Sequence, residues 1–153
     1  MHQPAASRRP DEPALLCPAA VTDASLMAGV LAVLSDQDLL EVGLLVNQHV
    51  KRRCQAAILA ELRALIAQDL EDGETESAAP VARVRIPVRQ CGGMPPYWSA
   101  SNLTFQHTDG VSTLCVDAAH TALDGLLNDL TCVDQPGPGD VLTVDLTTGG
   151  FGR

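Results

Sequence analysis

Aromatic residues are scarce in this sequence, which has two Phe, one Tyr and one Trp among 153 residues. A hydrophobic core must therefore be built from Leu, Val and Ala, within a hydrophobic fraction of 46%. That fraction is ordinary for a folded protein and too high for a fully disordered chain. The length suits one compact domain, or a small domain with a helical appendage.

Lysine is nearly absent, since Lys51 is the only one, and 10 basic residues face 19 acidic residues for a net charge of −9. A surface of this sign repels nucleic acids and anionic membranes at long range and attracts basic partners. The longest apolar run, residues 24–34, is too short to span a bilayer. No export signal is recognised near the N-terminus. We therefore expect an acidic cytoplasmic protein without membrane contact.

The sequence has no C-x-x-C pair, and its five cysteines are widely spaced. An odd number at such spacings is typical of neither a disulfide framework nor a zinc finger. The P-loop and the G-x-G-x-x-G, H-E-x-x-H and G-x-S-x-G motifs are also missing. These absences predict reduced thiols, no cofactor and, on balance, a protein that is not an enzyme.

Composition and spacing divide the chain into five segments. Residues 1–20 contain four prolines and are expected to form a disordered arm. Residues 21–72 predict two helices, the second running from Asp36 to about Leu70 with Ser35 as its N-cap and Asp38 at the third helical position. Residues 73–80 form a polar linker, residues 81–148 a small α+β domain, and residues 149–153 a tail.

The apolar residues of the second helix recur mostly every four positions, so the stripe that they form drifts round the helix. About 35 residues at 1.5 Å each would reach roughly 50 Å, which is longer than a domain of this size is wide. The helix could break near Gly43 or Asn47, project, or pack against a second copy. We favour packing against the first helix and a partner subunit, as in a coiled-coil homodimer.

Alternating residues predict a strand over residues 81–90, with Val84 and Ile86 on its inward face. Pro87 cannot donate to a ladder, which indicates an edge strand or a bulge. Residues 118–130 predict an amphipathic helix capped by Asp117, and residues 141–148 predict the last strand.

Residues 103–116 predict a β-hairpin whose two-residue turn is Asp109-Gly110. This turn would place His107 on the buried side and Cys115 on the other, so the two could not share a metal ion. The outer face of the hairpin would then carry Asn102, Thr104, Gln106 and Thr113.

The sequence therefore predicts an α+β fold. An N-terminal helical pair with one long helix precedes a β-β-β-α-β unit, whose mostly antiparallel sheet is covered on one face by a helix.

Arginines at alternate positions of the first strand form the strongest candidate binding site. A sheet face with arginine and aromatic side chains can bind an anionic or single-stranded ligand. The alternative is charge pairing across strands, for example with Asp145, and protection of the sheet edge. The candidate binding residues are Arg83, Arg85, Arg89, Tyr97, Trp98, Asn102, Thr104 and Gln106.

Three other constellations are weaker. A metal could use sulfur and imidazole ligands, but the hairpin register and the lack of a four-ligand spacing argue against it. Cys91 could act as a nucleophile with His107 or His120 as its base, although no motif fixes that pairing. A polar strip on the last predicted helix is explained by solvation. We predict no catalytic and no metal-binding residues among these groups, which comprise Cys91, His107, Cys115, Asp117, His120, Asp124, Asn128 and Cys132.

The leading functional hypothesis is a non-enzymatic protein–protein interaction or assembly protein that self-associates through its helices and presents its outer sheet face to a protein partner. The second is a nucleic-acid-associated regulator that uses Arg83, Arg85 and Arg89 or the Lys51–Arg53 cluster, which the acidic charge disfavours. The third is a small hydrolase dependent on a thiol or a metal.

Overall fold

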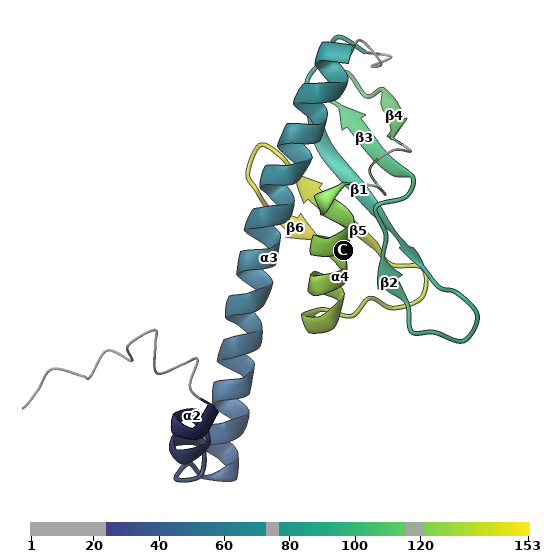
Figure 1. Ribbon diagram of the computed structural model, residues 1–153. Coiled ribbons are helices and arrows are strands. Elements are labelled where there is room, and N and C mark those ends of the chain that lie inside the picture. The colour runs from purple at the N-terminus through teal and green to yellow at the C-terminus, as the bar shows by residue number, and fades with distance from the viewer. Residues whose placement is uncertain (1–23, 73–76, 116–117, 119–120) are drawn as a thin grey trace, which may run out of the picture. The chain divides into compact units, whose positions relative to one another are not determined.

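The computed structural model describes residues 24–72, 77–115, 118 and 121–153 of the chain (Figure 1). The chain divides into two compact units, Met1–Gly43 and Leu44–Arg153. Its helices are α2 (Ala24–Leu31), α3 (Asp36–Asp72) and α4 (Ala122–Val133). Its strands are β1 (Val81–Arg89), β2 (Tyr97–Trp98), β3 (Leu103–His107), β4 (Ser112–Cys115), β5 (Val141–Asp145) and β6 (Phe151–Gly152). None of the described helices is long and apolar enough to cross a membrane.

The described part of the first unit contains α2 and the start of α3. The Ser35 hydroxyl donates to the Asp38 carboxylate at 2.6 Å, and the Asp38 backbone N–H donates to Ser35 Oγ at 3.2 Å. These bonds confirm the predicted N-cap, and the bond from Ser35 lowers the pKa of Asp38. No residue among 24–43 is buried. Even large apolar side chains are open to solvent there, since Leu26 is 56% and Val33 82% exposed.

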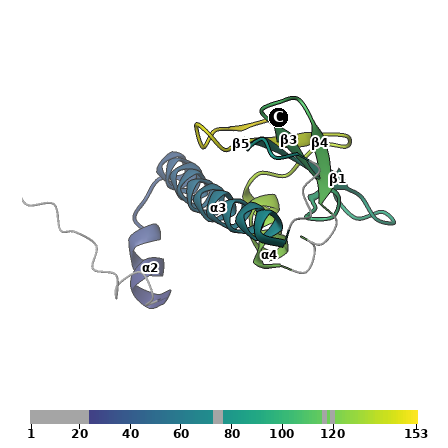
Figure 2. The ribbon, with the colours of Figure 1, turned by 90° about the horizontal axis from the view of Figure 1, so that it is seen from above.

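The second unit is a sheet of antiparallel pairs in the order β4-β3-β1-β5-β6, with β2 paired to β1. Both α4 and the second half of α3 lie on one face of this sheet, and Figure 2 shows the two layers. The predicted α+β class, long helix and antiparallel sheet are thus confirmed. The sheet is covered by two helices, whereas the sequence predicted one.

Aliphatic side chains from both helices meet the inward face of the strands, as the scarcity of aromatic residues requires. Trp98 and Phe105 are the two aromatic residues fully buried there. The buried core consists of Cys54, Ile58, Leu62, Val84, Ile86, Trp98, Ala100, Leu103, Phe105, Ala118, Leu123, Leu127, Leu130, Leu142 and Val144.

Strand β1 is the central strand, which corrects the prediction of an edge strand. It pairs with β5 on one side, and with β3 and then β2 on the other. The Pro87 carbonyl accepts from Ser99 N–H on the β2 side at 3.1 Å. Because the N–H and C=O of a residue point to the same side of a strand, the nitrogen of Pro87 also faces the gap between β3 and β2. The N–H that Pro87 lacks would not have pointed at β5, so no hydrogen bond between β1 and β5 is lost. The pairing of β1 with β3 shifts register between Val81 and Arg83, away from Pro87, so this irregularity is not the bulge that the sequence offered for the proline.

The predicted hairpin register is wrong by one residue. Leu103 lies opposite Cys115 and Phe105 opposite Thr113, so Thr113 shares the inward-facing side of the hairpin. The reason is a three-residue turn, in which Gly110 has φ +87° and its N–H donates to His107 C=O at 3.1 Å. His107 and Cys115 consequently lie on the same side of the hairpin, and Leu114, 58% exposed, takes the place of Thr113 on the outer face.

The segment before β1 is tied to this turn. The Ser77 hydroxyl donates to the Asp109 carboxylate at 2.6 Å, and the Val111 backbone N–H donates to the same carboxylate at 3.0 Å. His107 Nδ1 lies 2.7 Å from the carbonyl oxygen of Ala79, and Thr108 N–H donates to Pro80 C=O at 2.9 Å. The bond from Ser77 is the main cause of the lowered pKa of Asp109.

Replacing Asp109 by Asn should therefore destabilise the fold at neutral pH and have little effect in acid. A carboxyl whose pKa is lowered by folding contributes stability above its unfolded pKa, and this contribution is lost as pH falls through the folded pKa. Thermal unfolding midpoints measured from neutral pH to about pH 2 should converge for the two proteins. Ser77→Ala should show the same convergence, and a difference that is constant with pH would contradict the assignment.

Two element boundaries also differ from prediction. Helix α4 begins at Ala122 with Thr121 as its N-cap, whose side chain accepts from Leu123 N–H, and it ends at Val133. The predicted cap Asp117 lies outside the described residues. Residues 151–152, within the predicted tail, form β6 and pair with β5.

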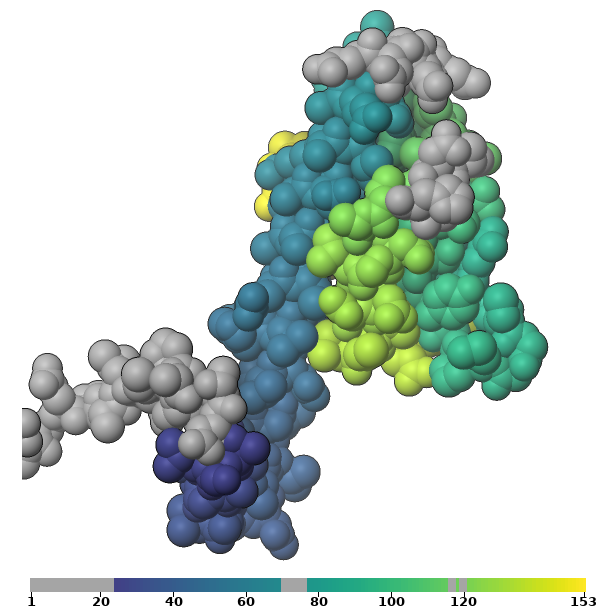
Figure 3. Space-filling view, in the orientation of Figure 1, coloured from purple at the N-terminus to yellow at the C-terminus, as the bar shows by residue number. Residues whose placement is uncertain are grey.

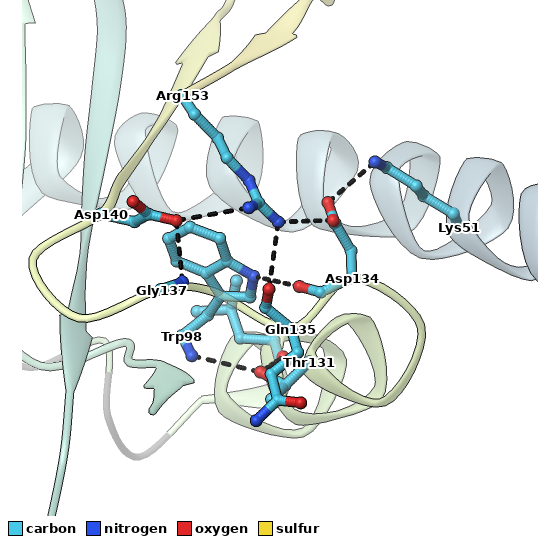
Figure 4. A network of polar contacts seen from close by, with 9 residues as sticks. Lys51, Trp98, Thr131, Asp134, Gln135, Gly137, Asp140 and Arg153 are labelled. Atoms are coloured by element: carbon cyan, nitrogen blue, oxygen red, sulfur yellow. Dashed lines mark hydrogen bonds and ion pairs between the residues drawn. The ribbon is translucent and has the colours of Figure 1, made fainter. Parts of the chain in front are cut away.

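A network of ion pairs and hydrogen bonds lies beside Trp98 in the second unit (Figure 4). The Arg153 guanidinium bonds to the carboxylates of Asp134 and Asp140 and lies 5.5 Å from the Trp98 ring centroid. Lys51 Nζ lies 2.8 Å from Asp134, so the network joins α3 to the loop after α4. These ion pairs are partly exposed, and we expect each to contribute no more than about 1 kcal/mol.

Candidate interaction site

An apolar stripe on α3 is only partly covered within the second unit. Positions 46, 50, 54 and 58 follow one another at intervals of four, and Cys54 and Ile58 are buried in the core. Val50 is half-buried, and Val46 is 54% exposed. At 100° per residue each step of four turns the stripe by about 40°, so Val46 lies about 120° round the helix from Ile58. Toward the N-terminus the stripe therefore turns away from the sheet and becomes an exposed apolar surface.

Two further leucines widen this surface, since Leu44 is 62% and Leu45 65% exposed. We call Leu44, Leu45 and Val46 the α3 patch. Leu45, Val46 and His49 help to line a depression of about 450 Å³ on the helix. Exposed neighbouring Leu and Val side chains are uncommon on monomeric proteins and mark contact surfaces.

A groove of about 270 Å³ continues from the patch between α3 and α4, which lie side by side at the surface in Figure 3. Val50, Cys54 and Ala57 line it from α3 and Leu126 from α4, and the charged residues Arg53 and Asp129 stand at its sides. Cys54 is buried, and burial raises the pKa of its thiol, so it contributes to the groove as a small apolar side chain. The groove therefore offers mainly apolar contact.

The candidate binding residues predicted from the sequence differ in exposure, and they do not form one surface. Arg83, Arg85 and Arg89 are exposed on the sheet face opposite the helices. Thr104 and Gln106 are their half-buried neighbours on β3. Asn102 is exposed before β3 with φ +62°.

The two aromatic candidates do not form an open stacking surface. Trp98 is 1% exposed, and its indole N–H donates to the carbonyl oxygen of Asp134 at 3.1 Å. Tyr97 is half-buried, and its hydroxyl lies 3.7 Å from Cys91 Sγ. That hydrogen bond is the main cause of the raised pKa of Tyr97. The sequence grouped Trp98 with the arginines on an open sheet face, and its burial corrects that expectation.

The structure does not bring the candidate nucleophile Cys91 and the candidate base His107 together, and the other candidate base, His120, lies outside the described residues. His107 lies near the start of β1, whereas Cys91 follows the end of β1. At about 3.3 Å per residue, the strand holds them roughly 26 Å apart. The ring nitrogens of His107 are bonded to Ala79 C=O and to Thr113 Oγ1 at 2.7 and 3.0 Å. His107 is 4% exposed, so it serves as a buried hydrogen-bonding residue.

The described residues also provide no metal-binding site. No group of three or more His, Cys, Asp or Glu side chains there could hold an ion. None of the four described cysteines forms a disulfide. Asp124 and Asn128 of the polar strip are exposed on α4, while Asp117 and His120 lie outside the described residues.

The basic cluster of α3 is split. Lys51 pairs with Asp134, whereas Arg52 and Arg53 are exposed. Arg63 lies farther along the helix and donates to Leu146 C=O at 2.9 Å.

Comparison of the chain with protein-family models, with curated proteins and with solved structures gives no match.

Proposed function

We propose that this chain is a non-enzymatic assembly protein that self-associates through its helices, with the α3 patch as part of the interface. The observation that carries the proposal is the exposure of three successive apolar residues, Leu44, Leu45 and Val46, where the apolar stripe of α3 has turned away from the sheet. Removing such side chains from water stabilises an assembly by about 25 cal/mol per Å² of apolar surface. The apolar groove beside α4 enlarges the surface on which a partner helix can pack.

A second copy is the partner that fits best. Residues 1–23 contain few large apolar residues, namely Met1, Leu15, Leu16 and Val21. Another copy brings an identical helix, and a two-fold axis places identical patches against one another. The first unit supports the same partner, since Leu26, Val30 and Val33 are exposed there. We also propose a reducing cytoplasmic location, in keeping with cysteines that form no disulfide in the described residues.

Replacing Leu45 and Val46 by Glu should convert a dimer or higher oligomer to a monomer. Each charge would have to be desolvated at the interface, while in the monomer the side chains stay in water. Sedimentation equilibrium of the full-length chain at several concentrations gives the mass, and far-UV circular dichroism checks the fold.

Met94→Glu is the matched control, because Met94 is 63% exposed in the loop after β1, away from the α3 patch. This variant should keep the mass of the unmodified chain. A monomeric unmodified chain at all concentrations would overturn self-association. Equal dissociation by both variants would remove the patch from the interface.

A further inference from the structure

We propose that the outer face of β1 binds an acidic peptide segment of a partner protein, with Arg85 and Arg89 as the residues that receive its carboxylates. This face is separate from the α3 patch, since the helices pack on the other side of the sheet (Figure 2). The inference therefore stands independently of self-association.

The charge on this face is opposite to that of the chain. Three arginines project from β1, and Asp145 is the one acidic residue opposite them in the β3 and β5 pairings. The whole chain carries −9. Arg83 lies 3.6 Å from Asp145, while the guanidinium groups of Arg85 and Arg89 have no hydrogen bond or ion pair within the described part of the chain. Two unpaired guanidinium groups on a pleated face are available to an external anion.

The neighbours of Arg85 suit a carboxylate. Thr104 of β3 and Thr143 of β5 are its direct cross-strand partners, so a threonine flanks Arg85 on each side. A carboxylate can accept two N–H bonds from arginine and further bonds from hydroxyl groups. Leu114, 58% exposed, is the cross-strand partner of Thr104 and adds an apolar contact for the same segment.

A peptide fits this surface better than a nucleic acid does. The long-range repulsion from a chain of charge −9 grows with the number of phosphates in a ligand. Base stacking needs open aromatic faces, whereas Trp98 is buried and Tyr97 is half-buried. A short segment with few carboxylates contacts the arginines directly. The negative charges elsewhere on the chain repel it only weakly, because salt screens them beyond about 8 Å at physiological ionic strength.

The test measures fluorescence anisotropy of a labelled hexaglutamate peptide against the full-length chain at physiological salt. We expect saturable binding, and a dissociation constant at least about tenfold higher for the Arg85→Gln, Arg89→Gln double variant. The matched control is Arg52→Gln with Arg53→Gln, which removes the same charge from exposed positions on α3. Because both residues line the hollows on α3, sedimentation first checks that this variant keeps the mass of the unmodified chain. This control should bind like the unmodified chain.

Three results would overturn the proposal. The first is no binding of the peptide, and the second is equal weakening by both double variants, which would show a general charge effect. The third is tighter binding of a labelled oligothymidylate than of the peptide, which would assign the face to nucleic acid.

Discussion

Replacing Trp98 by Ala is expected to lower the free energy of unfolding by about 3–5 kcal/mol. The side chain is 1% exposed in the core, and its indole N–H donates to Asp134 C=O. Removing it leaves a cavity between the sheet and α4 and deprives that carbonyl of its donor. Since small domains are stable by about 5–15 kcal/mol, the loss is a large share of the total.

Urea unfolding followed by far-UV circular dichroism measures this loss, because the variant has no tryptophan to report by fluorescence. Trp98→Phe is the companion variant, which keeps an aromatic ring and removes the indole donor. Its loss should be clearly smaller and should include about 1 kcal/mol for the hydrogen bond. If Trp98→Ala changed stability by less than about 1 kcal/mol, the ring would not be the packed core residue that we describe.

Local patterns were sufficient for most elements of the fold. The Ser35–Asp38 box, the start of α3 and the alternation of β1 each depend on neighbours in sequence, and the structure has them all. The hairpin register required more than local information. Asp-Gly suits both a two-residue and a three-residue turn, and here the Asp109 carboxylate is also bonded by Ser77, 32 residues earlier in the chain.

Pro87 and Trp98 illustrate the same limit. A proline excludes a strand from the interior of a sheet only where its nitrogen faces a paired neighbour, and here it faces the gap between two short strands. Trp98 was grouped with the arginines of β1 on an open sheet face, whereas it is buried. Its actual place depends on Asp134 and Thr131, which lie more than 30 residues away.

The candidate interaction site was predictable only in outline. The apolar interval of four in α3 runs from position 46 to position 58 and turns by about 40° at each step, so the pattern shows a drift but not the residue at which packing against the sheet ends. That limit depends on the length of the sheet and the position of α4. Similarly, the alternation of arginines in β1 predicted a common face, while the pairing of Arg83 and the lack of a partner for Arg85 required the cross-strand register.

Replacing Ile58 by Ala should test where that limit lies, with an expected loss of about 2–5 kcal/mol in the free energy of unfolding. Ile58 has no exposed surface and packs with strand residues such as Val84 in the core. Leu45→Ala is the control on the same helix, because Leu45 is 65% exposed and its replacement should change the stability of a monomer by no more than about 0.5 kcal/mol.

Urea unfolding of both variants at low protein concentration measures the difference directly. At high concentration the cost of Leu45→Ala should grow if this residue is buried between copies, since association stabilises the folded chain by mass action. A cost of Ile58→Ala as small as that of Leu45→Ala would contradict the packing of α3 on the sheet, and with it the continuity between the core stripe and the α3 patch.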